Sequence, residues 1–248
     1  MATAARSLEQ PADRPPHRYA PPPRGLVATM PLEELLRSAG RPPLPMRLPF
    51  AADAERLVWT AGCQDLLQAP CVAIVGSRAV SREGAARARR LARELVGAGV
   101  VIVSGLAKGV DTEALTAAID AGGRVIAVIG TPLDRAYPAE NAALQERIYR
   151  DHLLLSPYAE GARVFRGNFP ARNRLMAALS DATVIVEAGD TSGTLHQAVE
   201  CDRLGRWLLI AQSILTNGAL SWPLRFRDLP KVRALTDTRD VLAVLPSR

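Results

Sequence analysis

The sequence is poor in lysine, cysteine and aromatic residues. Only Lys108 and Lys231 are lysines among its 31 basic side chains, so guanidinium groups carry nearly all of the positive charge. Guanidinium groups suit bidentate contacts with phosphate, although a GC-rich genome would also favour arginine codons. The excess over 25 acidic side chains gives a net charge of +6, which permits a polyanionic partner without requiring one.

Cysteines and long apolar runs are also scarce. Cys63, Cys71 and Cys201 lack the spacing of a zinc site or of a disulfide framework, so we expect reduced, buried thiols. No run approaches the ~20 apolar residues that cross a bilayer, and the N-terminus lacks the apolar core of a signal peptide. We therefore expect a cytoplasmic protein with no membrane contact, metal or cofactor.

The first 56 residues differ in composition from the rest of the chain. Stretches such as PADRPPHRYAPPPRG are too rich in proline, alanine and arginine to form a periodic apolar face. We predict that residues 1–56 form a largely disordered extension, with one short helix over 31–39 where three leucines share a face. Residues 57–248 are predicted to form the compact domain.

From residue 57 onward, short apolar runs rich in β-branched residues alternate with helical segments. This alternation is typical of βαβ units around a parallel sheet. We expect an α/β protein with an extended Rossmann-like fold, in which helices flank a mostly parallel sheet. The predicted strands cover residues 72–75, 100–103, 125–129, 153–155, 183–187 and 207–211, and the predicted helices cover about 85–95, 112–121, 140–150, 172–179, 192–204 and 237–245.

Four of the loops that follow these strands are rich in glycine and other small residues. Parallel strands bring such loops to one edge of the sheet, where ligands bind, and their backbone N–H groups can hold phosphate. One such loop is often an ordinary turn, whereas four on one rim indicate a phosphate-binding surface. The residues selected from these loops are Gly76, Ser77, Arg78, Ser104, Gly105, Lys108, Gly109, Ser192, Gly193 and Thr194.

Recognised motifs for nucleotide cofactors are missing from these loops. Neither GxGxxG nor GxxxxGK[ST] occurs there, so binding of nicotinamide cofactors or ATP is not indicated. No nucleophile stands at a recognisable spacing from a general base, and we predict that the protein is not an enzyme. Asp111 is expected to cap the next helix or to orient Lys108, and His17, His152 and His196 are expected to be structural or solvated.

The segment FRGNFPARNR has the composition of a single-strand-binding surface. It places a phenylalanine among arginines and amides. Guanidinium groups hold phosphates while an aromatic ring stacks on a base, at roughly 1 to 3 kcal/mol per stacked base. An alternative interpretation makes the ring a core anchor and the arginines the solvated start of a helix. The residues selected here are Asn168, Phe169, Arg172, Asn173 and Arg174.

Several ordered motifs together resemble the DNA-processing protein A (DprA, or Smf) family. They are VAIVGSR, SGLAKGVDTEA, GGRVIAVIGTPLDRAYPAEN, LLLSPY, FPARNRLMAALS and VIVEAGDTSGTL, and the resemblance runs from about residue 57 to the C-terminus. It implies a homodimeric Rossmann-like protein that binds and protects single-stranded DNA and loads the recombinase RecA in natural transformation, without catalysis. It also implies that Arg78, Lys108, Phe169, Arg172 and Arg174 form the DNA pocket.

The sequence departs from this family in two places. Leu115 stands where members usually have histidine, and residues 210–213 replace a Pro-Gly pair, so the chain resembles a divergent short member. The alternative function is a non-catalytic sensor of nucleotide derivatives from a related Rossmann-like family. Related phosphoribohydrolases carry PGGxGTxxE, but the counterpart here, GDTSGTLHQ, has Gln197 in place of the catalytic glutamate. An amide cannot act as that carboxylate, which disfavours hydrolysis.

Overall fold

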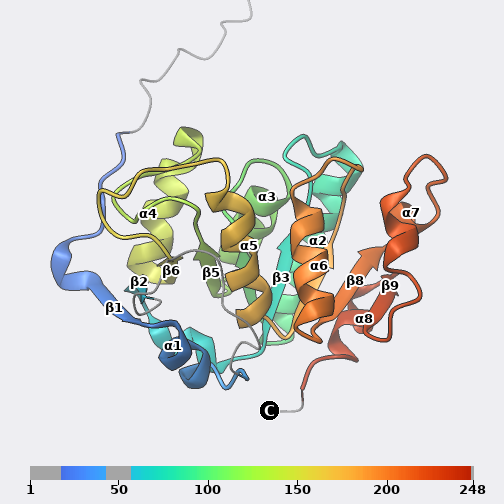
Figure 1. Cartoon of the computed structure of the whole chain (residues 1–248), viewed down its shortest axis with the longest axis horizontal. Helices are drawn as coiled ribbons and strands as arrows, with labels where there is room; N and C mark the ends of the chain where they lie inside the picture. Colours follow the sequence, from blue (N-terminus) through green and yellow to red (C-terminus); the bar gives the residue numbers. More distant parts are fainter. Residues whose placement is uncertain (1–17, 43–56, 247–248) are drawn as a thin grey trace, which may run out of the picture.

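The computed structural model describes residues 18–42 and 57–246, which form one nine-stranded sheet between two layers of helices (Figure 1). The strands are β1 (Val27–Pro31), β2 (Leu57–Gly62), β3 (Cys71–Val75), β4 (Val101–Ser104), β5 (Val125–Val128), β6 (Leu153–Ser156), β7 (Ala182–Ile185), β8 (Trp207–Ala211) and β9 (Val232–Leu235). The helices are α1 (Leu32–Ser38), α2 (Arg82–Gly97), α3 (Val110–Asp120), α4 (Ala142–Asp151), α5 (Asn168–Leu179), α6 (Thr194–Arg203), α7 (Gln212–Leu215) and α8 (Thr238–Leu242). The expected α/β fold with a mostly parallel sheet is confirmed.

The order of the strands reverses in the middle of the sheet. Across the sheet the order is β1-β2-β6-β5-β4-β3-β7-β8-β9. β1 and β2 pair antiparallel with each other, β2 pairs antiparallel with β6, and all other pairs are parallel. The chain adds β4, β5 and β6 on one side of β3, then returns to add β7, β8 and β9 on the other. The reversal therefore lies between β3 and β7, and ligands of open parallel sheets bind beside the carboxyl ends of the strands at such a point.

Both faces of the sheet are covered by helices, which explains why its central strands are continuous apolar runs. α2, α3, α4 and α8 pack on one face, and α1, α5, α6 and α7 pack on the other. On α2, the buried residues Ala88, Leu91, Ala92 and Leu95 recur at helical spacing. In Figure 1, α5 and α6 lie in front of the sheet on either side of β3. No helix in the described segments is both long and apolar enough to cross a membrane.

The six predicted strands are all present, with ends that agree within two residues. The six predicted helices correspond to α2, α3, α4, α5, α6 and α8. The largest difference at a helix start is in α5, which begins at Asn168 rather than at Arg172. Pro170 does not prevent this earlier start, because the N–H groups of the first helical turn have no partner within the helix.

The N-terminal region differs from its prediction. The sequence predicts a largely disordered extension before residue 57, but residues 18–42 contribute β1 and α1 to the same fold, and β1 pairs along its length with β2. The predicted short helix is present as α1, and its three leucines are buried in the core. The proline-rich sequence around β1 did not predict a strand. β1 nevertheless includes Pro31, because an edge strand tolerates the missing N–H of proline. The predictions for residues 1–17 and 43–56 lie outside the described residues.

Candidate nucleic-acid interface

A pocket of about 750 Å³ opens at the carboxyl edge of the sheet, where the strand order reverses. The loops after β3 and β7 and the first turns of α5 and α6 line it. The Thr194 hydroxyl, at the start of α6, donates to the Gly76 carbonyl (3.3 Å), 118 positions earlier in the chain. The predicted residues that line this pocket are Gly76, Ser77, Arg78, Phe169, Arg172, Asn173, Ser192, Gly193 and Thr194.

The loop after β3 is fixed by Glu187, which follows β7. The Ser77 N–H donates to the Glu187 carbonyl (2.7 Å), and the Ser81 N–H donates to its carboxylate (3.0 Å). A Cβ on Gly76 would lie 2.7 Å from that same carbonyl oxygen, so the close approach of the two loops requires glycine. Arg78 stands between these anchors with its side chain exposed. The loop therefore holds the base of Arg78 in place and leaves its guanidinium free to meet a ligand.

Asp111 organises the loop after β4. Its carboxylate accepts hydrogen bonds from the N–H groups of Gly105 (3.1 Å) and Ala107 (3.3 Å). Burial raises the pKa of this carboxyl, while the nearby Arg172 guanidinium opposes the rise. The predicted contact of Asp111 with Lys108 is absent from the described part of the chain, where Lys108 forms an ion pair with Glu140. Asp111 therefore fixes the backbone of the loop after β4 through these two N–H groups and does not orient Lys108.

Arg172 lies beneath the pocket rather than on its rim. Its side chain is buried, and its Nη1 donates to the carbonyls of Gly105 and Val128 at the ends of β4 and β5. Its Nε donates to the Asn173 side chain (3.1 Å). Burial lowers the pKa of the Arg172 guanidinium to about 10, and the Asp111 carboxylate opposes this shift. Arg172 thus joins two strand ends to α5 and forms the charged floor of the pocket.

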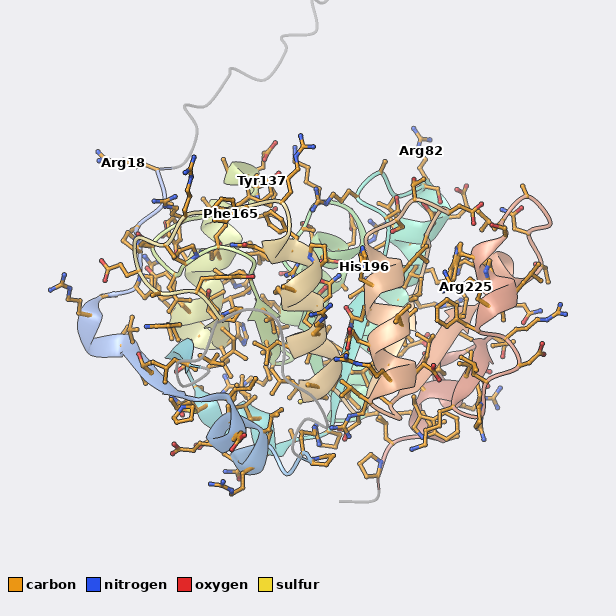
Figure 2. The ribbon with its side chains drawn as sticks, viewed as in Figure 1. Arg18, Arg82, Tyr137, Phe165, His196 and Arg225 are labelled. Carbon is orange, nitrogen blue, oxygen red and sulfur yellow. The ribbon has the colours of Figure 1, made fainter. Side chains whose placement is uncertain are left out.

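Phe169 lines both the main pocket and a smaller cavity of about 140 Å³. Its ring centroid lies 5.6 Å from Arg78 Cζ and 5.1 Å from the Tyr137 ring centroid. Tyr137 is exposed at the top of the molecule, along the edge that also carries Arg82 (Figure 2). Tyr137 was not among the residues selected from the sequence, although an aromatic residue in the loop after β5 was a usable signal. Gly105 and Lys108 line the smaller cavity.

Four predicted residues lie outside both linings. Ser104 is buried and donates to the Ile74 carbonyl (2.7 Å), and the carbonyl of the buried Asn168 accepts from the Tyr158 hydroxyl (3.1 Å). Arg174 Nε pairs with the Glu200 carboxylate at 2.9 Å, which turns it toward α6. Gly109 has a φ of 77° and packs against the Ser77 and Arg78 carbonyls. These four residues support the loops and helices around the pocket.

Two features bear on the chemistry of the pocket. Among residues 18–42 and 57–246, no group of three or more His, Cys, Asp and Glu side chains is placed to hold a metal ion. Gln197 lies fully buried in the pocket lining and donates to the Thr183 hydroxyl (3.2 Å). The position that carries a glutamate in the phosphoribohydrolase motif is therefore a neutral amide fixed by the core.

Comparison with known proteins decides the family. The model of the family described as DNA recombination-mediator protein A matches residues 38–221. The chain belongs to this family. It is 47% identical over 151 residues to the DNA processing protein DprA of Streptococcus pneumoniae, covering 61% of this chain and 52% of that protein. It is 31% identical over 177 residues to DprA of Bacillus subtilis, covering 71% and 59%. The chain spans about half the length of the Streptococcus relative.

Solved structures of the family share the fold described above. The X-ray structure of Streptococcus pneumoniae DprA matches with a TM-score of 0.74 and 36% identity, over 89% of this chain and 75% of that chain. DprA from Helicobacter pylori, whose structure is described as giving insights into its unique single-stranded DNA binding mode, matches with a TM-score of 0.69 and 27% identity, over 88% and 94%. The molybdenum cofactor binding protein of Rippkaea orientalis shares the fold alone, at a TM-score of 0.53 and 17% identity.

Proposed function

We propose that this DNA recombination-mediator family member binds single-stranded DNA in the pocket at the β3–β7 reversal. The observation that carries the proposal is the meeting of an exposed guanidinium, an aromatic ring and the backbone of two glycine-containing loops around one cavity. Arg78, Phe169 and Gly193 represent these three components. The single-stranded DNA binding named for the Helicobacter pylori relative supports the proposal.

Each component supplies one part of single-strand binding. The loop N–H groups and the Arg78 guanidinium hold backbone phosphates, and the Phe169 ring offers a surface on which a base stacks. The partly exposed Tyr137 ring lies beside Phe169 and extends this aromatic surface. Phosphate contacts and stacking do not distinguish one base from another, so we expect weak sequence preference.

The wider role that we propose is protection of the bound strand and loading of RecA in natural transformation or recombination. We further propose that the protein acts in the cytoplasm as a homodimer and catalyses no reaction. The absence of catalysis is supported by the neutral Gln197 amide in the pocket, which cannot exchange a proton as a glutamate would. Membership in the family supports the role in DNA processing.

The alternative function is that of a non-catalytic sensor of nucleotide derivatives. The pocket volume of about 750 Å³ favours this alternative, since sites for small ligands occupy roughly 300 to 1,000 Å³. A sensor would bind a mononucleotide nearly as well as an oligomer. A DNA-binding protein would gain affinity from each additional phosphate and base.

Fluorescence anisotropy of a labelled oligo-dT of a few tens of nucleotides tests the two functions. Single-strand binding predicts affinity that falls with salt, with a log-log slope of roughly 0.7 per neutralised phosphate. Unlabelled oligo-dT should compete well, whereas a matched duplex and thymidine monophosphate should compete poorly. Equal competition by the mononucleotide would favour the sensor and contradict the proposal.

Replacing Arg78 by alanine tests the site itself. We expect Arg78→Ala to weaken binding of oligo-dT by roughly tenfold to a hundredfold, because a charge-assisted hydrogen bond contributes roughly 1.5 to 3 kcal/mol. The urea unfolding midpoint should not change, since the side chain is exposed. Lys108→Ala should weaken binding in the same direction.

Arg93→Ala is the matched control, because it removes the same charge from an exposed position on α2 outside the pocket lining. Arg82 is the first residue of α2, at the end of the helix next to the loop that carries Arg78. Arg93 lies about 16 Å further along the helix, given a rise of about 1.5 Å per residue. Equal losses of affinity in the Arg78 and Arg93 variants would show that net charge alone governs binding.

A further inference from the structure

A second hollow, of about 540 Å³, lies beyond β6 and shares no lining residue with the DNA pocket in the described part of the chain. One wall is the N-terminal segment from Pro21 to Thr29. The rest of the lining comes from Trp59 on β2, which pairs with Thr29, and from the loops after β5 and β6. The segment that begins at Arg18, labelled at the upper left of Figure 2, leads into this wall.

Specific hydrogen bonds hold the walls of this hollow in place. The Tyr19 hydroxyl donates to the Leu133 carbonyl (2.7 Å) and accepts from the Gln145 side chain (2.8 Å). The Ala20 N–H donates to the Glu146 carboxylate (2.8 Å), and the Ala20 carbonyl accepts from the Tyr149 hydroxyl (2.9 Å). The N-terminal segment is therefore docked on α4, so the hollow is a built feature of the fold.

The lining of the hollow is rich in hydrogen-bond acceptors. Pro21, Pro22 and Pro23 have no backbone N–H. The carboxylates of Asp134 and Glu160 also line it, and Arg24 is the basic residue that the described segments contribute to the lining. One carboxylate oxygen of Asp134, Oδ1, is buried and has no hydrogen-bond partner among the described residues. An unsatisfied acceptor of this kind costs free energy in the unliganded protein.

The charge of the hollow is opposite to that of the chain as a whole, which has a net charge of +6. The Asp134 and Glu160 carboxylates outnumber the Arg24 guanidinium, which disfavours a phosphate and favours a cation. The Trp59 ring lines the same space, and indole is the strongest of the aromatic partners for a cation. A guanidinium has five donors and no acceptor, and its plane stacks on an aromatic ring while its edge meets a carboxylate. It therefore matches this lining better than a nucleotide does.

We infer that this hollow binds a guanidinium group, presented as an arginine side chain by a partner protein. Trp59 stacks on the guanidinium plane, and Asp134 and Glu160 accept its N–H donors. The same carboxylates repel the α-carboxylate of free arginine, so an arginine within a peptide is the better ligand. This site is separate from the DNA pocket, and its test does not depend on DNA binding.

Titration of the full chain with the peptide acetyl-Gly-Arg-Gly-amide, followed by NMR of the tryptophan indole N–H signals, tests the inference. Trp59→Phe assigns the signal of Trp59 among the three tryptophans. We expect a saturable shift of that signal which weakens with salt. The same peptide with citrulline, a neutral isostere of arginine, should cause no shift, and free arginine should bind more weakly.

Asp134→Asn is expected to weaken peptide binding by roughly tenfold to a hundredfold, since a hydrogen bond to a charged group contributes roughly 1.5 to 3 kcal/mol. Glu160→Gln, at an exposed loop position, keeps the test valid if the Asp134 variant does not fold. Asp228→Asn is the matched control, because its exposed carboxylate lies outside this lining. An unmoved Trp59 signal, equal shifts with the citrulline peptide, equal binding of free arginine, or displacement by oligo-dT would each overturn the inference.

Discussion

The two ends of the parallel sheet hold their arginines in different ways. At the amino end, Arg41 donates to the Leu179 carbonyl (2.8 Å) and pairs with Asp181 (2.8 Å), and both side chains are buried. At the carboxyl end, Arg78 is exposed and has no ion-pair partner among the described residues. The charge at the amino end is therefore satisfied within the protein, whereas the charge at the carboxyl end remains available to a ligand. The first stabilises the fold, and the second is suited to binding.

The sharpest test of this difference is to remove the buried arginine. We expect Arg41→Ala to lower the free energy of unfolding by about 3 kcal/mol, because the buried Asp181 carboxylate loses its ion-pair partner. Urea denaturation followed by circular dichroism measures this loss. The folded fraction of the variant should bind oligo-dT as the original chain does, since Arg41 lies outside the DNA pocket.

Arg147→Ala is the control for that experiment. Arg147 pairs with Asp120 at 3.3 Å, and both side chains are about half exposed. Exposed pairs contribute less than about 1 kcal/mol. Equal losses of unfolding free energy in the Arg41 and Arg147 variants would show that burial of the ion pair does not determine its contribution to stability.

The carboxyl end of the sheet also contains a buried arginine, Arg172. Gly105→Ala tests the close packing around its guanidinium. A Cβ at residue 105 would overlap the Arg172 guanidinium. We expect a loss of roughly 1 to 3 kcal/mol in unfolding free energy, as for other substitutions that overpack a core. Oligo-dT affinity should fall as well, because a displaced Arg172 changes the pocket floor.

Gly189→Ala provides the comparison, since nothing lies within 4 Å of its added Cβ and its φ is not positive. Its effect on stability should stay within about 0.5 kcal/mol. Equal destabilisation by Gly105→Ala and Gly189→Ala would show that close packing against Arg172 does not determine the cost of the substitution at residue 105.

Much of the fold was predictable because parallel strands leave a strong sequence signal. Buried strands such as β3 and β7 read as short apolar runs between helical segments, and their ends were predicted within two residues. β1, β2 and β9 were not predicted. Two of them, β1 and β9, are edge strands with mixed burial, and β1 lies in a proline-rich segment. Their pairing depends on partners distant in the sequence, which local patterns do not reveal.

The candidate site was predictable at the level of loops but not of individual side chains. The glycine-containing loops meet because the sheet is parallel, and this follows from the pattern alone. The three arginines of FRGNFPARNR lie in three environments: Arg166 lines the pocket, Arg172 is its buried floor, and Arg174 pairs with Glu200. Arg166 precedes α5, and the environments of Arg172 and Arg174 depend on which face of α5 each occupies. Those faces did not follow from the sequence, because the predicted start of the helix was four residues late.

The smallest expected effect concerns His152, at the amino end of β6. Burial lowers the pKa of this imidazole, helped by Arg124 and opposed by Asp151, and its Nδ1 has no partner in the described segments. In the unfolded chain the imidazole protonates near its usual pKa of about 6.5. The unfolded state therefore binds protons first as pH falls. The stabilising contribution is present above about pH 6.5 and is lost as pH drops through that value toward the lower pKa of the folded state.

Urea denaturation at pH 8, 6.5 and 5 tests this pH dependence through its slope rather than through absolute stability. His152→Gln should flatten the decline between pH 7 and pH 5, and His196→Gln, at an exposed position on α6, is the matched control. An identical slope in the two variants would remove His152 as the cause. A flattened slope with unchanged oligo-dT affinity would show that His152, like Arg41 at the same end of the sheet, contributes to stability and not to binding.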